Sequence, residues 1–342
     1  MYTPGVAEVV KSIKNHPGQV YNLTIKNNTI AVITDGSAVL GLGNVGAEAA
    51  LPVMEGKCAI FKEFAGINAF PICLKTQNIQ EIITIIKNIS PTFAAINLED
   101  ISAPRCFEIE KKLQNLDIPV MHDDQHATAI VVLAGLINAA VVVNKDLKKC
   151  KTVITGVGAA GTAVAKLLVF YGLENIILVD SKGILSNKRQ DLEGYKKNLL
   201  VISNRENQSG NLNQAVKNAD ILIGVSQKDI FTKDIIKNLN NKSIVFALAN
   251  PDPEITASNA NKWGVIVYAN GRSDNINQVN NALVFPGFFK GLIQKKITRI
   301  TNKMKLSTAI ALASLIKKPT SKCFIPSIFD RRIVPTIAKS IA

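Results

Sequence analysis

Residues 97–128, NLEDISAPRCFEIEKKLQNLDIPVMHDDQHAT, carry two pairs of adjacent acidic residues, one at each end of a single supersecondary unit. The apolar run 94–98 is typical of a short buried strand. Residues 106–116 place apolar and charged side chains at helical spacing, and 118–121 form a second short apolar run. Strand, helix and strand in this order predict two parallel neighbours in one sheet.

The acidic pairs follow these two strands directly. Glu99 and Asp100 follow the first strand, and Asp123 and Asp124 follow the second, 24 residues further on. Because the carboxyl ends of parallel strands meet at one edge of a sheet, we expect the four carboxylates to converge. Oxygen ligands of this kind suit Mg²⁺ or Mn²⁺. The alternative is that these acids only end strands and cap a helix.

Length and composition indicate a two-domain globular protein. The chain has 342 residues, of which 47% are hydrophobic and 19% charged, and a single core rarely grows to that size. Its five cysteines are scattered without a CxxC motif, so neither a zinc site nor a disulfide framework is predicted. The first residues lack the pattern of a secretory signal. We therefore expect a cytoplasmic protein.

The net charge of +14 raises the question of nucleic-acid or membrane binding. The excess consists of 33 lysines against 7 arginines, spread along the chain, whereas base recognition favours arginine. The longest apolar run, 127–143, is interrupted by polar residues and barely reaches the length of a membrane span. We expect a buried helix there, and neither nucleic acid nor a membrane as partner.

A glycine-rich motif predicts a dinucleotide site. GVGAAG at 156–161 follows a predicted strand at 152–155 and opens a helix of small residues. The next strand, 176–179, ends in Asp180, 19 residues past the last glycine, where an acid can accept the ribose hydroxyls. The glycines would let the backbone approach the pyrophosphate at the helix N-terminus. The candidate cofactor-binding residues are Gly156, Val157, Gly158, Ala159, Ala160, Gly161, Asp180 and Ser181.

The N-terminal part of the chain contains weaker patterns. Residues 6–13 predict a helix, and the runs 20–26 and 29–34 resemble the two strands of a hairpin. A second match to GxGxxG, at 41–46, is not followed by a strand ending in an acid at the right distance. We therefore interpret it as a structural turn.

Strands and helices alternate from residue 151 to 268, which is typical of a doubly wound sheet. The predicted fold is α/β with two domains. We expect an N-terminal α/β domain at residues 1–126, which carries the candidate metal site, and a Rossmann-like dinucleotide-binding domain with a C-terminal helical tail at residues 127–342.

Several long sequence segments between Tyr2 and about Pro335 resemble those of malic enzymes of the short bacterial type. They are YTPGVAEV from residue 2, DGSAVLGLGNVG from 35, LPVMEGKCAIFKEFAGI from 51, INLEDI from 96, HDDQHATA from 122, GVGAAG from 156, ANPDPE from 249 and NNALVFPG from 280. Their number and order make the resemblance specific.

The resemblance implies oxidative decarboxylation of (S)-malate to pyruvate and CO₂, with reduction of NAD, or NADP, and Mg²⁺ or Mn²⁺ as cofactor. The implied catalytic residues are Tyr2, Lys57 and Asp123, the metal ligands are Glu99, Asp100 and Asp124, and the malate-binding residues are Lys57, Asn250 and Asn281. Lys57 would be the base, provided that burial or neighbouring charge lowers its pKa toward neutrality. Tyr2 would protonate the enol carbon.

Two departures from the family pattern stand out. YTPGV normally follows a few dozen residues, whereas Tyr2 is second here, and Ala38 stands where larger malic enzymes have a malate-binding arginine. We expect a homodimer in which the N-terminal segment is anchored at the interface. Two other functions stay open: a malolactic enzyme that releases lactate, and a non-catalytic dinucleotide sensor.

Cofactor preference depends on opposing local charges. Asp180 would favour the ribose hydroxyls of NAD and repel the 2′-phosphate of NADP. Lys182, two residues further on, offsets that repulsion in part. We expect NAD to be the better substrate, with measurable use of NADP.

Overall fold

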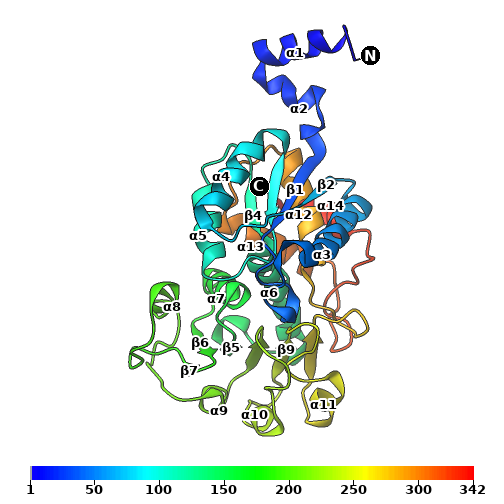
Figure 1. The fold of residues 1–342 in the computed structure, drawn as a ribbon. Coiled ribbons are helices and arrows are strands. Elements are labelled where there is room, and N and C mark those ends of the chain that lie inside the picture. The colour runs from blue at the N-terminus through cyan, green and yellow to red at the C-terminus, as the bar shows by residue number, and fades with distance from the viewer. Residues whose placement is uncertain (1) are drawn as a thin grey trace.

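A sheet of four parallel strands forms the centre of the N-terminal domain in the computed structural model, which describes residues 2–342 (Figure 1). The strand order is β2-β1-β3-β4, with bounds β1 (Thr29–Thr34), β2 (Asn68–Cys73), β3 (Ala95–Leu98) and β4 (Val120–His122). The pairing of β3 with β4 is parallel, which confirms the arrangement predicted from residues 97–128. All residues of β1 and β3 are buried, most of them apolar, because helices cover both faces of the sheet.

The helices on each face are set by their apolar spacing. On one face, α4 (Ile79–Ile89) buries Ile82, Ile83 and Ile86, and α5 (Arg105–Leu113) packs beside it. On the other face lie α3 (Gly46–Ile60) and α6 (Asp123–Val143). The predicted crossover helix is therefore α5, which connects β3 to β4.

The second domain contains a six-stranded sheet of order β10-β9-β8-β5-β6-β7. Its strands are β5 (Lys151–Thr155), β6 (Asn175–Asp180), β7 (Gly183–Ile184), β8 (Ile221–Gly224), β9 (Ile244–Ala247) and β10 (Val267–Asn270), and only β7 pairs antiparallel. The helices between them are α7 (Ala159–Tyr171), α8 (Gly194–Leu199), α9 (Leu212–Ala215), α10 (Lys233–Lys237) and α11 (Ala257–Lys262). The doubly wound prediction is confirmed.

Helix α6 joins the two domains. It runs from the end of β4 into a core shared with α7 and with α13 (Asn302–Ala313), whereas α12 (Phe285–Gln294) and α14 (Ile333–Ser340) pack together beside it. Among the described residues α6 alone is long and apolar enough to cross a membrane, but 72% of its most apolar window is buried. It is a core helix, as the interrupted apolar run predicted.

An arm of helical turns precedes the first strand and projects away from both domains (Figure 1). Helix α1 (Val6–Asn15) confirms the predicted helix, and none of its residues is buried. The predicted hairpin is wrong: residues 20–28 form α2 (Val20–Leu23) and a short 3-10 turn. Thr24 explains the difference, since its hydroxyl donates to the Val20 carbonyl and accepts the Lys26 amide, which favours local turns.

Candidate active site

Three carboxylates converge at the carboxyl edge of the first sheet. Glu99 and Asp100 directly follow β3, and Asp124 lies in the first turn of α6, directly after β4. One oxygen from each lies within 4.8 Å of the others. The Asp100 amide also donates to Asp124 Oδ2 at 2.9 Å, so the two acid pairs are connected directly. The predicted convergence of these three residues is confirmed.

The electrostatics of this edge suit a hard cation. Burial, and then the neighbouring Asp124, raise the pKa of Asp100 to about 8, and burial also raises the pKa of Glu99, although Lys57 opposes this. Among the described residues, Asp100 Oδ2 is a buried oxygen without a hydrogen-bond partner. Crowded oxygens of this kind are costly unless a cation compensates them. The residues therefore fit Mg²⁺ or Mn²⁺.

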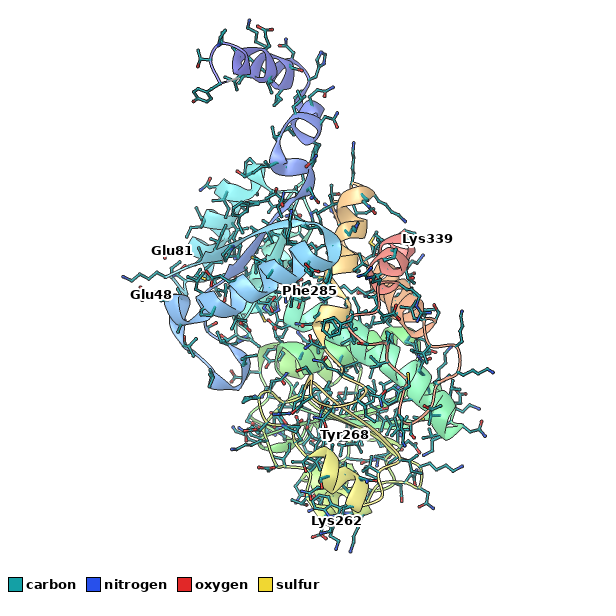
Figure 2. All side chains as sticks on the ribbon, turned by 90° about the vertical axis from the view of Figure 1, so that its right-hand side faces the viewer. Glu48, Glu81, Lys262, Tyr268, Phe285 and Lys339 are labelled. Atoms are coloured by element: carbon teal, nitrogen blue, oxygen red, sulfur yellow. The ribbon has the colours of Figure 1, made fainter. Side chains whose placement is uncertain are left out.

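Lys57, from the last turn of α3, lies beside the acids and is only 6% exposed. Its Nζ is 2.6 Å from both Asp123 Oδ2 and Glu99 Oε2, and lies 4.2 Å from the centre of the Phe285 ring. Figure 2 labels Phe285 near the middle of the molecule. Asp123 thus faces the lysine, while Asp124 faces the other acids.

The condition set for Lys57 as a neutral base, a pKa lowered toward neutrality, is not met in this geometry. Burial does act to lower the pKa, but Asp123 and Glu99 more than offset it, so the pKa lies above the ordinary value. Lys57 is therefore an ammonium at neutral pH, with Asp123 positioned to take its proton. Any role as a base has to belong to the Lys57–Asp123 pair rather than to a neutral lysine alone.

The two asparagines predicted to bind malate occupy different surroundings. Asn281 begins the short turn before α12, and its Nδ2 donates to Asp123 Oδ2 at 2.6 Å. Asn250 follows β9 and is exposed, with its side chain against Gly271 and its carbonyl against Gly41. Asn281 therefore joins the Lys57 group directly, whereas Asn250 stands at the boundary between the domains.

The predicted dinucleotide loop has the required close packing. A Cβ at Gly161 would collide with the Gly156 carbonyl, and one at Gly156 with the Val225 carbonyl. Above Gly158, in contrast, the space is open, and the N-terminus of α7 has no side-chain cap. Ala159 and Ala160 form the first turn of that helix. The loop thus leaves backbone N–H groups free to meet a pyrophosphate.

The end of β6 is more positively charged than the sequence pattern indicated. Asp180 accepts from Arg189 Nη1 and from Lys196 Nζ, each at 2.7 Å. Despite partial burial, these contacts hold the pKa of Asp180 below its ordinary value. Lys182, expected to be free for a phosphate, pairs with Asp191 at 3.1 Å. Ser181 is exposed next to Asp180.

Family models place these two halves in one family. A model of the malic enzyme N-terminal domain matches residues 1–114, and a model of the malic enzyme NAD-binding domain matches residues 125–342. The chain belongs to the malic enzyme family. Its two α/β domains, the second of them Rossmann-like, are those that the sequence predicted.

Similar members of the malic enzyme family cover the whole chain. A protein named NAD-dependent malic enzyme from Geobacillus stearothermophilus is 48% identical over 100% of this chain and 72% of its own length. A bifunctional malic/malolactic enzyme from Bacillus subtilis (strain 168) is 46% identical over 100% of this chain and 84% of its own. The crystal structure of NAD-dependent malic enzyme from Thermotoga maritima superposes with a TM-score of 0.97, at 44% identity, covering 100% of this chain and 91% of that one.

Tyr2 is a predicted catalytic residue that the structure does not bring to the site. Its side chain is 83% exposed, on the arm that projects away from the domains (Figure 1). Ala38 itself offers no positive charge for a malate carboxylate. The nearby Arg105 side chain pairs with Asp35 at 2.8 Å. The second glycine-rich match, 41–46, is a turn that packs against the Asn250 carbonyl, as interpreted from the sequence.

Three residues beside the candidate site were not predicted from the sequence. Arg189 and Lys196 were missed because they lie in a polar loop and a short helix, 9 and 16 residues after Asp180. Glu254, fully buried, accepts the Ser226 and Ala249 amides and thereby ties the loop after β9 to the end of β8. Of the three, only Glu254 lies within a sequence segment that resembles malic enzymes, ANPDPE at 249–254, and could have been noticed there.

Proposed function

We propose that this chain catalyses the oxidative decarboxylation of (S)-malate to pyruvate and CO₂ with reduction of NAD. The observation that carries the proposal is the buried Lys57 side chain, whose Nζ lies 2.6 Å from Asp123 and Glu99, beside a three-carboxylate edge. This arrangement combines a proton-transfer group with a set of cation ligands in one place. The family and its named relatives support it.

Each proposed site residue has a separate role in the reaction. Asp123 accepts a proton from Lys57, and the amine then takes the proton of the C2 hydroxyl. Asn281, bonded to the same Asp123 oxygen, keeps that carboxylate oriented and presents its remaining groups to malate. A bound nicotinamide supplies the hydride acceptor, and a divalent cation held by Glu99, Asp100 and Asp124 supplies Lewis-acid stabilisation of the enolate. Tyr2 donates the proton that completes pyruvate.

Mg²⁺ or Mn²⁺ is the proposed metal, and NAD the preferred dinucleotide with NADP also used. The choice of metal rests on an all-oxygen ligand set. The choice of dinucleotide rests on Asp180, with Arg189 and Lys196 beside it. Relatives named as NAD-dependent and as NADP-dependent malic enzymes support both possibilities.

The proposed working form is a cytoplasmic homodimer, without nucleic acid or membrane as partner. Tyr2 cannot serve the site of its own chain while the arm projects as described, and the arm exposes apolar side chains that include Val10 and Ile25. Packing of the arm against a second copy would cover them and bring Tyr2 to that copy's site. The same contact would explain why α1 has no buried residue.

A malolactic activity is the second candidate, because one relative at 46% identity is named a bifunctional malic/malolactic enzyme. The two reactions leave different products. The test incubates purified protein with (S)-malate, NAD and Mn²⁺ and measures NADH, pyruvate and lactate. Equimolar NADH and pyruvate support the proposal, lactate without net NADH supports the second candidate, and no turnover supports a non-catalytic sensor.

A further inference from the structure

Three polar side chains lie behind the acidic edge and take no part in the proposed chemistry: Glu110 on α5, His126 on α6 and Lys305 on α13. His126 Nε2 is 2.9 Å from Glu110 Oε2, and Lys305 Nζ is 2.9 Å from His126 Nδ1. The side chains of His126 and Glu110 are only 18% and 13% exposed. A largely shielded polar chain across three helices is costly to assemble unless its contacts hold something in place.

Glu110 contacts the backbone from which two proposed site residues project. Its Oε1 accepts the His122 amide at 2.9 Å, and its Oε2 accepts from Gln125 Nε2 at 3.3 Å. Asp123 and Asp124 lie between these two residues in the chain. The Glu110 carboxylate therefore contacts the residue before Asp123 and the residue after Asp124.

The start of α6 needs such a partner. Its N-cap, His122, provides no side-chain hydrogen bond to the helix, so the first turn lacks the usual local cap. Glu110 supplies an anion at this N-terminus from another helix, where the helix dipole favours negative charge. In keeping with these contacts, and despite its burial, the pKa of Glu110 is lowered to about 2, with His126 as the main opposing influence.

We propose that Glu110 is a positioning residue that fixes the β4–α6 turn, so that Asp123 meets Lys57 while Asp124 meets Glu99 and Asp100. The two acids point to different partners from adjacent positions, with Asp123 2.6 Å from Lys57 and Asp124 2.9 Å from the Asp100 amide. A displacement of the turn by about 1 Å would disturb both contacts together. This inference rests on the proposed metal site.

Metal binding without substrate provides the test, by calorimetric titration of the full chain with Mn²⁺. Glu110→Ala is expected to weaken Mn²⁺ binding by about 10–100-fold, the usual effect of losing a partner that orients metal ligands. Glu110→Gln should fall between this variant and the wild type, because its amide oxygen can still accept from His122. Glu108→Gln, on the exposed face of α5 and paired with Lys112, is the matched control and should bind as the wild type does. NAD affinity should be unchanged in all three.

The outcomes separate positioning from a purely structural role. If Glu110→Ala melts at a lower temperature but binds Mn²⁺ as tightly as the wild type, Glu110 only stabilises the fold and the inference is overturned. If Glu110→Ala does not fold, Glu110→Gln decides, and wild-type Mn²⁺ affinity in that variant overturns the inference. If the wild-type protein itself binds no Mn²⁺, the proposed metal site is wrong and this inference fails with it.

Discussion

Lys57 stands between two buried carboxylates, and removing its charge changes more than one property of the site. Without the ammonium, Asp123 and Glu99 are left uncompensated in a buried environment, since each lies 2.6 Å from Nζ. Breaking a buried pair in this way typically costs about 3–5 kcal/mol. The residue is therefore expected to matter for stability as well as for catalysis.

Lys57→Met should lower malate oxidation by about 10²–10⁴-fold, the usual contribution of a positioned acid–base group, and should also lower the melting temperature. NAD binding should stay intact, because the dinucleotide loop lies in the other domain. Steady-state kinetics, NAD titration and thermal unfolding check this. Lys62→Met, five residues along and exposed, is the control. Near-normal turnover in Lys57→Met would remove Lys57 from the mechanism.

Cofactor choice is also decided by single residues. Lys196→Ala should lower kcat/KM for NADP several-fold while changing the value for NAD little, because Lys196 partly neutralises Asp180, the residue placed to repel a 2′-phosphate. Lys182→Ala should have the smaller effect, since Lys182 is paired with Asp191. Kinetics with both dinucleotides measure the difference. A larger loss of kcat/KM for NADP in Lys182→Ala than in Lys196→Ala would show that Lys182, as first expected, offsets the repulsion of the 2′-phosphate by Asp180.

At the scale of elements, local patterns predicted those parts of the chain where apolar spacing and tertiary packing agree. The strands β3 and β4 and the helix α5 follow from residues 97–128, because each buries the face that its sequence makes apolar. The strand predicted for residues 20–26 is wrong because local patterning and tertiary packing do not agree there. No strand lies beside them in the arm, so local hydrogen bonds of Thr24 decided their conformation.

The sequence predicts those parts of the site whose positions follow from the order of strands and helices along the chain. Acids at the ends of neighbouring parallel strands must meet, which is why Glu99, Asp100 and Asp124 converge as expected. The charge state of Lys57 and the partners of Asp180 depend on side chains distant in the sequence, and no local spacing reveals them. The same holds for Glu110, which in the sequence is one more charged residue of an amphipathic helix.

The contacts of α5 to the start of α6 lead to a pH prediction. The folded-state pKa of Glu110 is about 2, against an ordinary value of 4.5. Its ionised form therefore stabilises the fold fully above about pH 4.5, and this contribution is lost as pH falls through about 2. The difference in melting temperature between wild type and Glu110→Gln should shrink as pH falls from about 5 toward about 2. A difference that grows on acidification would contradict the assignment.

At the scale of the whole molecule, the arm raises the question of which site Tyr2 serves. In a dimer with exchanged arms, a mixture of two inactive variants, Tyr2→Phe and Lys57→Met, should recover part of the activity after subunit exchange. One site of the mixed dimer would then combine an intact Lys57 with an intact Tyr2 from the partner. Activity of the exchanged mixture measures this. Without recovery, although mixed dimers form, Tyr2 would have to serve its own chain.

The interface itself can be tested separately. Val10→Asp places a charge on the exposed apolar part of α1 and should weaken the dimer, because burying an unpaired charge is costly. Sedimentation velocity over a dilution series reports the change, with Lys14→Ser on the same helix as control. A wild-type protein that is monomeric and fully active at every concentration would contradict the proposed dimer.

The central claim is that one group of side chains binds a divalent metal and oxidises malate. Its most direct test compares Mn²⁺ titrations of NADH formation from (S)-malate in the wild type and in Asp124→Asn, with Asp117→Asn as an exposed control on the same domain. The account predicts saturable Mn²⁺ dependence with equimolar pyruvate in the wild type and the control, and loss of both metal affinity and turnover in Asp124→Asn. Unchanged Mn²⁺ dependence in Asp124→Asn would contradict it.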